Sequence, residues 1–199
     1  MLRIALTGGI GCGKTEACRI FQHDYKVPVI DTDEIARQLV QPGEETLQQI
    51  TAAFGNSILL ANGTLNRAAL ANEVFNNETK RRQLESILHP KIRDSVEQQI
   101  QQLDADYVIV AIPLLIETDQ QSDYDRVLVI DCKPSQQIAR TLQRDERNAQ
   151  QVQAIIDAQA SREQRLQVAD DIIDNSKDRQ FLQQQIAQLH TKYSALNSD

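Results

Sequence analysis

One loop-forming motif near the amino terminus constrains this chain more than any other stretch. Residues 8–15 read Gly-Gly-Ile-Gly-Cys-Gly-Lys-Thr, which fits the G-x-x-x-x-G-K-[ST] pattern of a phosphate-binding loop. The apolar run before it, residues 2–7, predicts a buried strand, and residues 16–21 have helical character. A strand, this loop and a helix in that order form the context in which the pattern binds phosphate.

The residue types in this loop explain the chemistry we expect of it. Glycines allow a tight turn with positive φ, so that successive N–H groups can surround phosphate oxygens. The helix that begins near Gly13 adds the positive end of its dipole. Lys14 can reach the β- and γ-phosphates, and the Thr15 hydroxyl can bind Mg²⁺. We therefore predict a nucleotide-phosphate site made by Gly9, Ile10, Gly11, Cys12, Gly13, Lys14 and Thr15.

Strand and helix patterns alternate along the rest of the chain. Apolar runs predict further strands, and the helical patterns between them favour an α/β fold with a doubly wound parallel sheet covered on both faces. These runs are residues 27–30, 107–112, 126–131 and 169–174. In such a sheet ligands bind at the carboxyl ends of the strands. The glycine loop, Asp31, Asp33, the segment from Pro113 to Glu117 and Asp131 all follow strand ends, so we expect them on one face.

Residues 44–103 contain no good strand and predict a helical insertion. Helices are expected over 67–75, 78–88 and 91–103, with His89-Pro90 ending the second of them. A polar stretch from residue 148 to 167 is helical by propensity but has few apolar anchors, as a lid should. An amphipathic helix is expected from Asp178 to the end of the chain.

Two aspartates lie just beyond the second predicted strand. A carboxylate within hydrogen-bond reach can orient or deprotonate an attacking hydroxyl in phosphoryl transfer. The alternative is that Asp31 or Asp33 merely caps the helix that follows. Next to a phosphate loop we favour catalysis by Asp33, with Asp31 assisting.

Arginines recur on the helix predicted from Ser135 to about Arg147. Arg140, Arg144 and Arg147 are spaced i, i+4 and i+7, so that they should share one face and could clamp transferring phosphate. Arg162 and Arg165 could add to this clamp. The alternative is a solvated face paired with neighbouring acidic residues.

Two further candidates are weaker. His89 could contact the acceptor or could simply lie exposed at a helix end, and Glu117 could be a plain loop carboxylate. Cys12 has no required chemistry, because the loop uses its backbone N–H, although an exposed thiol there would make the protein sensitive to thiol reagents.

Composition excludes several other classes of protein. The net charge of −7 makes the chain a poor general nucleic-acid binder. Three cysteines without paired spacing argue against a disulfide scaffold or a zinc site and favour a reducing cytoplasm. No apolar run approaches the roughly 20 residues that span a bilayer, so we expect no membrane association.

Seven stretches together resemble the dephospho-CoA kinase family, in the order of that family and over most of the chain. They are LTGGIGCGKT, VIDTDEIAR, LHPKIR, VAIPLLIE, RTLQRDE, QASREQRL and VADDIIDN. GKT is shared by many kinases, whereas VIDTDEIAR, LHP and PLLIE are far more specific. Three residues depart from the family's usual pattern. Cys12 stands where the family usually has Ser, Thr15 where it commonly has Ser, and Thr32 where it usually has Ala. Thr15 keeps the hydroxyl.

The resemblance implies a single P-loop kinase domain with a three-layer fold and a five-stranded sheet. Its core would be residues 1–43, 104–135 and 168–199, its acceptor subdomain 44–103, and its lid 136–167. The implied reaction is transfer of the ATP γ-phosphate to the 3′-hydroxyl of dephospho-CoA, with Mg²⁺.

The same resemblance implies roles for individual residues. Asp33 would lie by the 3′-hydroxyl, with Lys14 and Arg140 as the other catalytic residues. Asn175 would lie near the adenine, and Arg140 and Arg144 near the nucleotide. Residues implied to bind the acceptor are Asp31, Asp33, His89, Leu114, Leu115 and Glu117.

Two alternatives remain open at this point. Another nucleoside monophosphate or small-molecule P-loop kinase would use the same phosphate loop, carboxylates and arginines. A regulatory GTPase is disfavoured because no convincing guanine-reading N-K-x-D segment is found. The sequence is compatible with either a monomer or a small homo-oligomer.

Overall fold

The computed structural model describes residues 1–75 and 77–196, which form two compact units. The first unit combines Met1–Asp31 with Leu103–Asp199, and the second is Thr32–Gln102. The domain scheme expected from the sequence stays a prediction. The part of the last expected helix that covers residues 197–199 lies outside the described residues.

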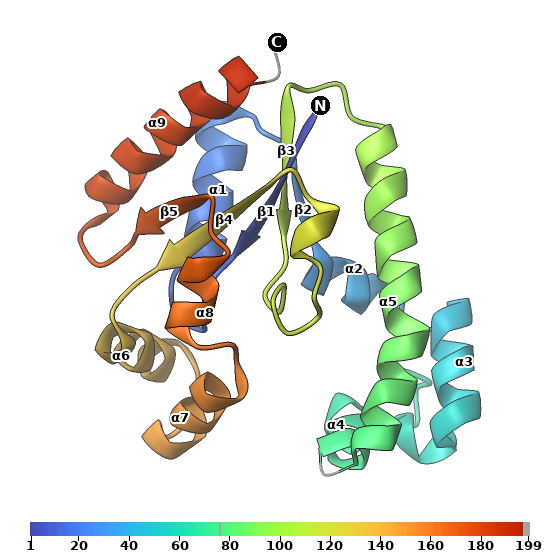
Figure 1. Cartoon of the computed structure of the whole chain (residues 1–199). Helices are drawn as coiled ribbons and strands as arrows, with labels where there is room; N and C mark the ends of the chain where they lie inside the picture. The colour runs from blue at the N-terminus through green and yellow to red at the C-terminus, as the bar shows by residue number, and fades with distance from the viewer. Residues whose placement is uncertain (76, 197–199) are drawn as a thin grey trace. The chain divides into compact units, whose positions relative to one another are not determined.

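The first unit contains a sheet whose described strands are all parallel (Figure 1). They are β1 Leu2–Thr7, β2 Val29–Asp31, β3 Tyr107–Ala111, β4 Arg126–Asp131 and β5 Asp171–Asp174. Their order is β2-β3-β1-β4-β5, which confirms the expected parallel sheet of five strands. The strand that leads into the glycine loop, β1, therefore has neighbours on both sides and lies at the centre of the sheet.

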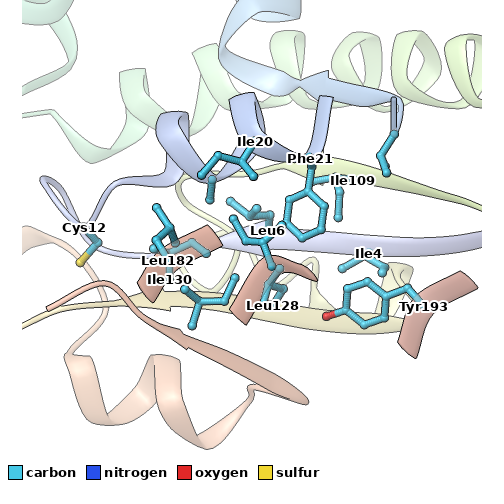
Figure 2. Close-up of a cluster of buried hydrophobic side chains, with 14 of the residues drawn as sticks. Ile4, Leu6, Cys12, Ile20, Phe21, Ile109, Leu128, Ile130, Leu182 and Tyr193 are labelled. Atoms are coloured by element: carbon cyan, nitrogen blue, oxygen red, sulfur yellow. The ribbon is translucent and has the colours of Figure 1, made fainter. Parts of the chain in front are cut away.

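Apolar side chains between the sheet and two helices form the core of the first unit. Helices α1 (Lys14–Tyr25) and α9 (Arg179–Leu196) pack against each other and supply Phe21, Leu182 and Tyr193 (Figure 2). β3 is buried throughout and β4 over all but its first residue, as expected for interior parallel strands. The other helices of this unit are α6 Pro134–Arg144, α7 Ala149–Ala158, α8 Arg162–Gln167 and the short η2 Gln121–Asp123.

A partly buried ionic cluster joins the sheet to α9. Asp171, at the start of β5, accepts hydrogen bonds from Arg126 Nε at 2.8 Å, Tyr193 Oη at 3.0 Å and Lys192 Nζ. Burial raises the pKa of Asp171, but these bonds from Lys192, Arg126 and Tyr193 outweigh it and hold the pKa below its ordinary value. The charged form of this carboxylate therefore stabilises the fold.

The second unit is helical, as the sequence predicts. Its helices are α2 Thr32–Gln38, α3 Glu45–Phe54, α4 Arg67–Phe75, α5 Glu78–Gln101 and the short η1 Asn56–Ile58. The bounds expected for α4 are confirmed, and Gly55 caps the end of α3. A separate core made by Val40, Leu47, Ile50, Ile58 and Leu70 holds these helices together.

The expected helix break at His89-Pro90 is wrong. α5 runs without interruption through Pro90. A proline inside a helix costs about 3 kcal/mol, because one hydrogen bond is lost and its ring crowds the preceding turn. Leu84, Ile87 and Leu88 pack against the second core before the proline, and Val96 is buried after it. Burial on both sides keeps one long helix.

The helix that carries the arginines is shorter than expected. α6 ends at Arg144, where Asp145 caps it, so Arg147 is not part of the helix. The expectation that three arginines share one helical face is therefore wrong for Arg147. None of the helices in the described part of the chain is long and apolar enough to cross a membrane. A cytoplasmic location stays a prediction.

Candidate functional site

Polar groups gather where the parallel strands of the first unit end. The strand register places Asp31 beside Ala111 and Asp131 beside Asp174, while β1 runs directly into the glycine loop. The carboxyl ends of the strands therefore carry the glycine loop, Asp31 and Asp131 along one edge of the sheet. This is the edge at which parallel sheets bind ligands.

The glycine loop follows a path that only glycine fits at two positions. Gly11 has φ 72° and Gly13 has φ 97°, both in the left-handed region. A Cβ on Gly11 would lie 2.6 Å from the backbone oxygen of Gln137, and one on Gly13 would lie 2.2 Å from the side-chain nitrogen of Asn175. Conformation and close contact both require glycine here, so the loop has one shape.

Three side-chain carboxamides hold the loop backbone. Gln137 Nε2 donates to the Ile10 carbonyl at 2.8 Å, and Asn175 Nδ2 donates to the Cys12 carbonyl at 2.8 Å. The Ile10 N–H in turn donates to Gln159 Oε1 at 2.9 Å. These side chains come from α6, from the residue after β5 and from the end of α7, so distant segments set the geometry of the loop.

Two of these three carboxamide side chains were not predicted from the sequence, and the third was predicted to have another role. Gln137 and Gln159 were not candidates, and Asn175 was expected near the adenine. Gln137 is almost completely buried, and so is Thr141 one helical turn later. The sequence signal that could have identified Gln137 is its spacing of i and i+4 from Thr141, which places both polar residues on one face of the helix.

Lys14 lies over the loop that precedes it. Its Nζ donates to the carbonyl of Gly8 at 2.6 Å and to that of Gly9 at 3.2 Å. The ammonium is thus held beside the amides expected to bind phosphate. Thr15 is exposed on the first turn of α1, where the N–H groups of a helix lack intrahelical acceptors. A cation, a hydroxyl and helix amides together suit an anion and its metal ion.

Arg140 has one guanidinium nitrogen that makes a hydrogen bond and one that has no partner among the described residues. Its Nη2 donates to the Asn175 carbonyl at 3.0 Å. Its Nη1 is buried and has no hydrogen-bond acceptor among the described residues. A buried donor without a partner costs about 1–3 kcal/mol, and more when it is charged. An anionic ligand at this nitrogen would remove that cost, so this part of the chain fits a phosphate group.

The other arginines are committed to carboxylates or to the backbone. Arg144 forms two hydrogen bonds to Asp145, at 2.7 and 3.0 Å, on the exposed side of α6. Arg162 contacts both oxygens of Asp131 at 2.6–3.1 Å. Arg165 is buried and donates to the Ala160 carbonyl. Arg140 therefore has the geometry that fits an added phosphate best among the candidate arginines, which are Arg140, Arg144, Arg147, Arg162 and Arg165.

The segment between α7 and α8 is tied to the loop after β3. The Ala160 N–H donates to Glu117 Oε1 at 2.6 Å, next to the Gln159 that contacts the glycine loop. Glu117 therefore fixes the segment expected to act as a lid. In the same loop Leu114 is exposed, whereas Leu115 is completely buried.

The remaining candidates lie at the helical unit. Asp33 is exposed in the first turn of α2, two residues after β2 ends, and His89 is half-buried in the middle of α5. Their roles in catalysis and acceptor binding stay predictions, as do those of Asp31, Leu114, Leu115 and Glu117. Within residues 1–75 and 77–196, no group of three or more His, Cys, Asp or Glu side chains could hold a metal ion.

A parallel sheet with this glycine loop at the end of its central strand is the fold of P-loop nucleotide-binding proteins. The family model described as dephospho-CoA kinase, CoaE, matches residues 2–180. The dephospho-CoA kinase of Nitrosospira multiformis is 46% identical over 197 residues, which cover 98% of each chain. That of Vibrio parahaemolyticus is 42% identical over 195 residues, or 98% of this chain and 96% of that one. The chain belongs to the dephospho-CoA kinase family.

Solved structures agree with this assignment. The structure of TT1252 from Thermus thermophilus has a TM-score of 0.84 and 25% identity, over 96% of this chain and 97% of that one. Dephospho-CoA kinase from Campylobacter jejuni has a TM-score of 0.72 and 27% identity over 98% of both chains. A shikimate kinase from Bacteroides thetaiotaomicron, at 17% identity and a TM-score of 0.53, shares the fold. The expected family, fold class and kinase class are confirmed.

Proposed function

We propose that this chain transfers the γ-phosphate of ATP to the 3′-hydroxyl of dephospho-CoA, giving coenzyme A and ADP. The observation that carries the proposal is the glycine loop, whose single backbone shape is held by three carboxamides at the end of the central strand. The family match over residues 2–180 supports the choice of acceptor.

The loop and its neighbours are proposed to hold ATP. Apart from that of Ile10, which donates to Gln159, the backbone N–H groups of residues 9–15 bind the phosphates together with the ammonium of Lys14. The unpartnered Nη1 of Arg140 donates to a phosphate oxygen, with Arg144 near the nucleotide. The Thr15 hydroxyl binds Mg²⁺, which neutralises charge on the phosphates when it is present. Because phosphoryl transfer needs little covalent help from the protein, these residues act by position and charge.

The acceptor is proposed to meet the carboxylates that follow β2. Asp33 orients the 3′-hydroxyl or takes its proton, and Asp31 assists. The helical unit with His89, together with the segment Leu114–Glu117, binds the rest of dephospho-CoA. Since Leu115 is buried, its part is to fix the backbone of that segment, while Leu114 offers an exposed apolar surface.

The identity of the product tests the proposal. The chain is incubated with ATP and Mg²⁺ and, in parallel reactions, with dephospho-CoA, AMP, CMP or shikimate, and the products are identified by mass. We expect phosphorylated product, coenzyme A, in the first reaction alone. Transfer to AMP, CMP or shikimate in preference to dephospho-CoA would establish a different small-molecule kinase. Tight GTP binding with no phosphorylated acceptor would instead favour a regulatory nucleotide switch.

A further inference from the structure

Two cysteine thiols from distant parts of the chain meet beneath the glycine loop. Cys12 belongs to the loop and Cys132 directly follows β4, and their sulfur atoms lie 3.4 Å apart. Both side chains are about 1% exposed. Figure 2 shows Cys12 at one end of the apolar core, on the loop between β1 and α1. The pair lies outside the set of groups that the proposed reaction uses, because only the backbone of Cys12 has a role there.

The surroundings make the two thiols unequal. The hydrogen bond donated by Cys132 lowers the pKa of Cys12 to about 7, and the positive charges of Lys14 and Arg165 act in the same direction against the effect of burial. The same bond, together with burial, raises the pKa of Cys132. Burial also raises the pKa of the third cysteine, Cys18, to about 12. Cys12 is therefore the more readily ionised and more nucleophilic of the two thiols, and its thiol partner is already in contact.

We propose that Cys12 and Cys132 are a modification site, at which a hydroperoxide produces a reversible disulfide that removes the loop from its phosphate-binding shape. The Cys12 thiolate attacks the peroxide O–O bond, forming a sulfenic acid as hydroxide leaves. The Cys132 sulfur then attacks the sulfenic sulfur, and the S–S bond forms as water leaves. In total, two thiols lose two electrons and two protons, and one hydrogen peroxide becomes two waters.

The structure explains why this bond would alter ATP binding. A disulfide brings the two sulfur atoms from 3.4 Å to about 2.05 Å apart. The loop has little freedom to absorb the change, because the Cys12 carbonyl is held by Asn175 and Gly11 lies directly against the Gln137 backbone. The movement therefore reaches the amides around Cys12. Displacing aligned groups by about 1 Å can cost on the order of a hundredfold in rate.

The buried sulfur of Cys12 lies next to backbone that is partly exposed. Gly11 and Gly13, on either side of Cys12, are partly exposed, so solvent reaches the backbone next to the buried sulfur. The loss of activity rests on the proposed function, whereas the formation of the disulfide and the loss of nucleotide affinity can be measured without any acceptor.

The test uses the full reduced chain treated with hydrogen peroxide. Free thiols are then blocked, the peptides are analysed by mass spectrometry, and the affinity for a non-hydrolysable ATP analogue is measured by calorimetry. We expect a peptide that links Cys12 to Cys132, at least a tenfold loss of affinity, and recovery of both after treatment with a thiol reductant. Cys18→Ser should behave like the wild type, whereas Cys132→Ser should bind the analogue normally before treatment and form no linked peptide.

Two results would overturn the inference. One is the absence of the linked peptide from wild-type protein at peroxide doses that oxidise its cysteines. The other is a linked peptide with unchanged affinity for the analogue. Cys132→Ala repeats the comparison if the serine variant does not fold. Inactivity towards dephospho-CoA would refute the proposed function. Because calorimetry needs no acceptor, the effect of the disulfide on nucleotide affinity could still be measured in that case.

Discussion

Replacing Gly11 with alanine tests whether the glycine loop has only one permitted shape. An alanine in the left-handed region costs about 1–2 kcal/mol. In addition, the new Cβ would lie 2.6 Å from the Gln137 backbone oxygen and 2.8 Å from Thr141 Oγ1. Forcing a methyl group into packed surroundings costs about 1–3 kcal/mol. We therefore expect Gly11→Ala to lower the free energy of unfolding by about 2–5 kcal/mol.

Gly63 offers a matched control for this substitution. Its φ of 79° is close to the 72° of Gly11, but nothing lies within 4 Å of an added Cβ. Gly63→Ala should therefore cost only the conformational part, about 1–2 kcal/mol. Urea unfolding measures both variants, and calorimetry with an ATP analogue should show lost affinity for Gly11→Ala alone. Equal destabilisation of the two variants, with normal ATP affinity, would refute the argument that backbone contacts shape the loop.

Three further predictions test the proposed chemistry and the fold. Lys14→Ala should lower kcat/KM at least tenfold, because a charge-assisted contact of about 1.5–3 kcal/mol is lost, while Lys26→Ala at the C-cap of the same helix should leave activity unchanged. Asp33→Asn should lower kcat by about 10²–10⁴-fold if this carboxylate handles the acceptor proton, and wild-type kcat would remove it from the mechanism. Asp171→Asn should destabilise the chain at pH 7 in thermal unfolding. Because the folded-state pKa of Asp171 is lowered, its contribution is complete above the unfolded pKa of about 3.9 and is lost as pH falls through the folded value, so the difference from wild type should shrink in acid. A difference that stays constant down to pH 2 would contradict this.

Local patterns in the sequence were enough to predict the frame of the fold. The glycine loop, the buried strands and α4 each depend on residues close together in the chain, so spacing and apolar periodicity identify them. The helix through Pro90 could not be predicted in that way. Its continuity depends on packing against a core contributed by α3 and α4, which local propensity does not record.

The candidate site shows the same limit. The phosphate loop was predicted from its own pattern, but Gln137 and Gln159 contact backbone atoms more than 120 residues away. A backbone N–H or carbonyl has no sequence signature, so no motif pairs it with a distant glutamine. The prediction that Arg147 shares a helical face with Arg140 was wrong for a different reason. The helix ends at Arg144, so the i+7 spacing does not apply.

The central place of β1 in the sheet has a consequence for biosynthesis. β1 is synthesised before the two strands beside it, which begin at Tyr107 and Arg126, and the last carboxamide that holds its loop is Asn175. Closing contacts so far apart in the chain is slow and cannot start until both partners exist. A nascent chain stalled before residue 175 should therefore be unable to retain ATP, although it already carries the entire G-x-x-x-x-G-K-T signature.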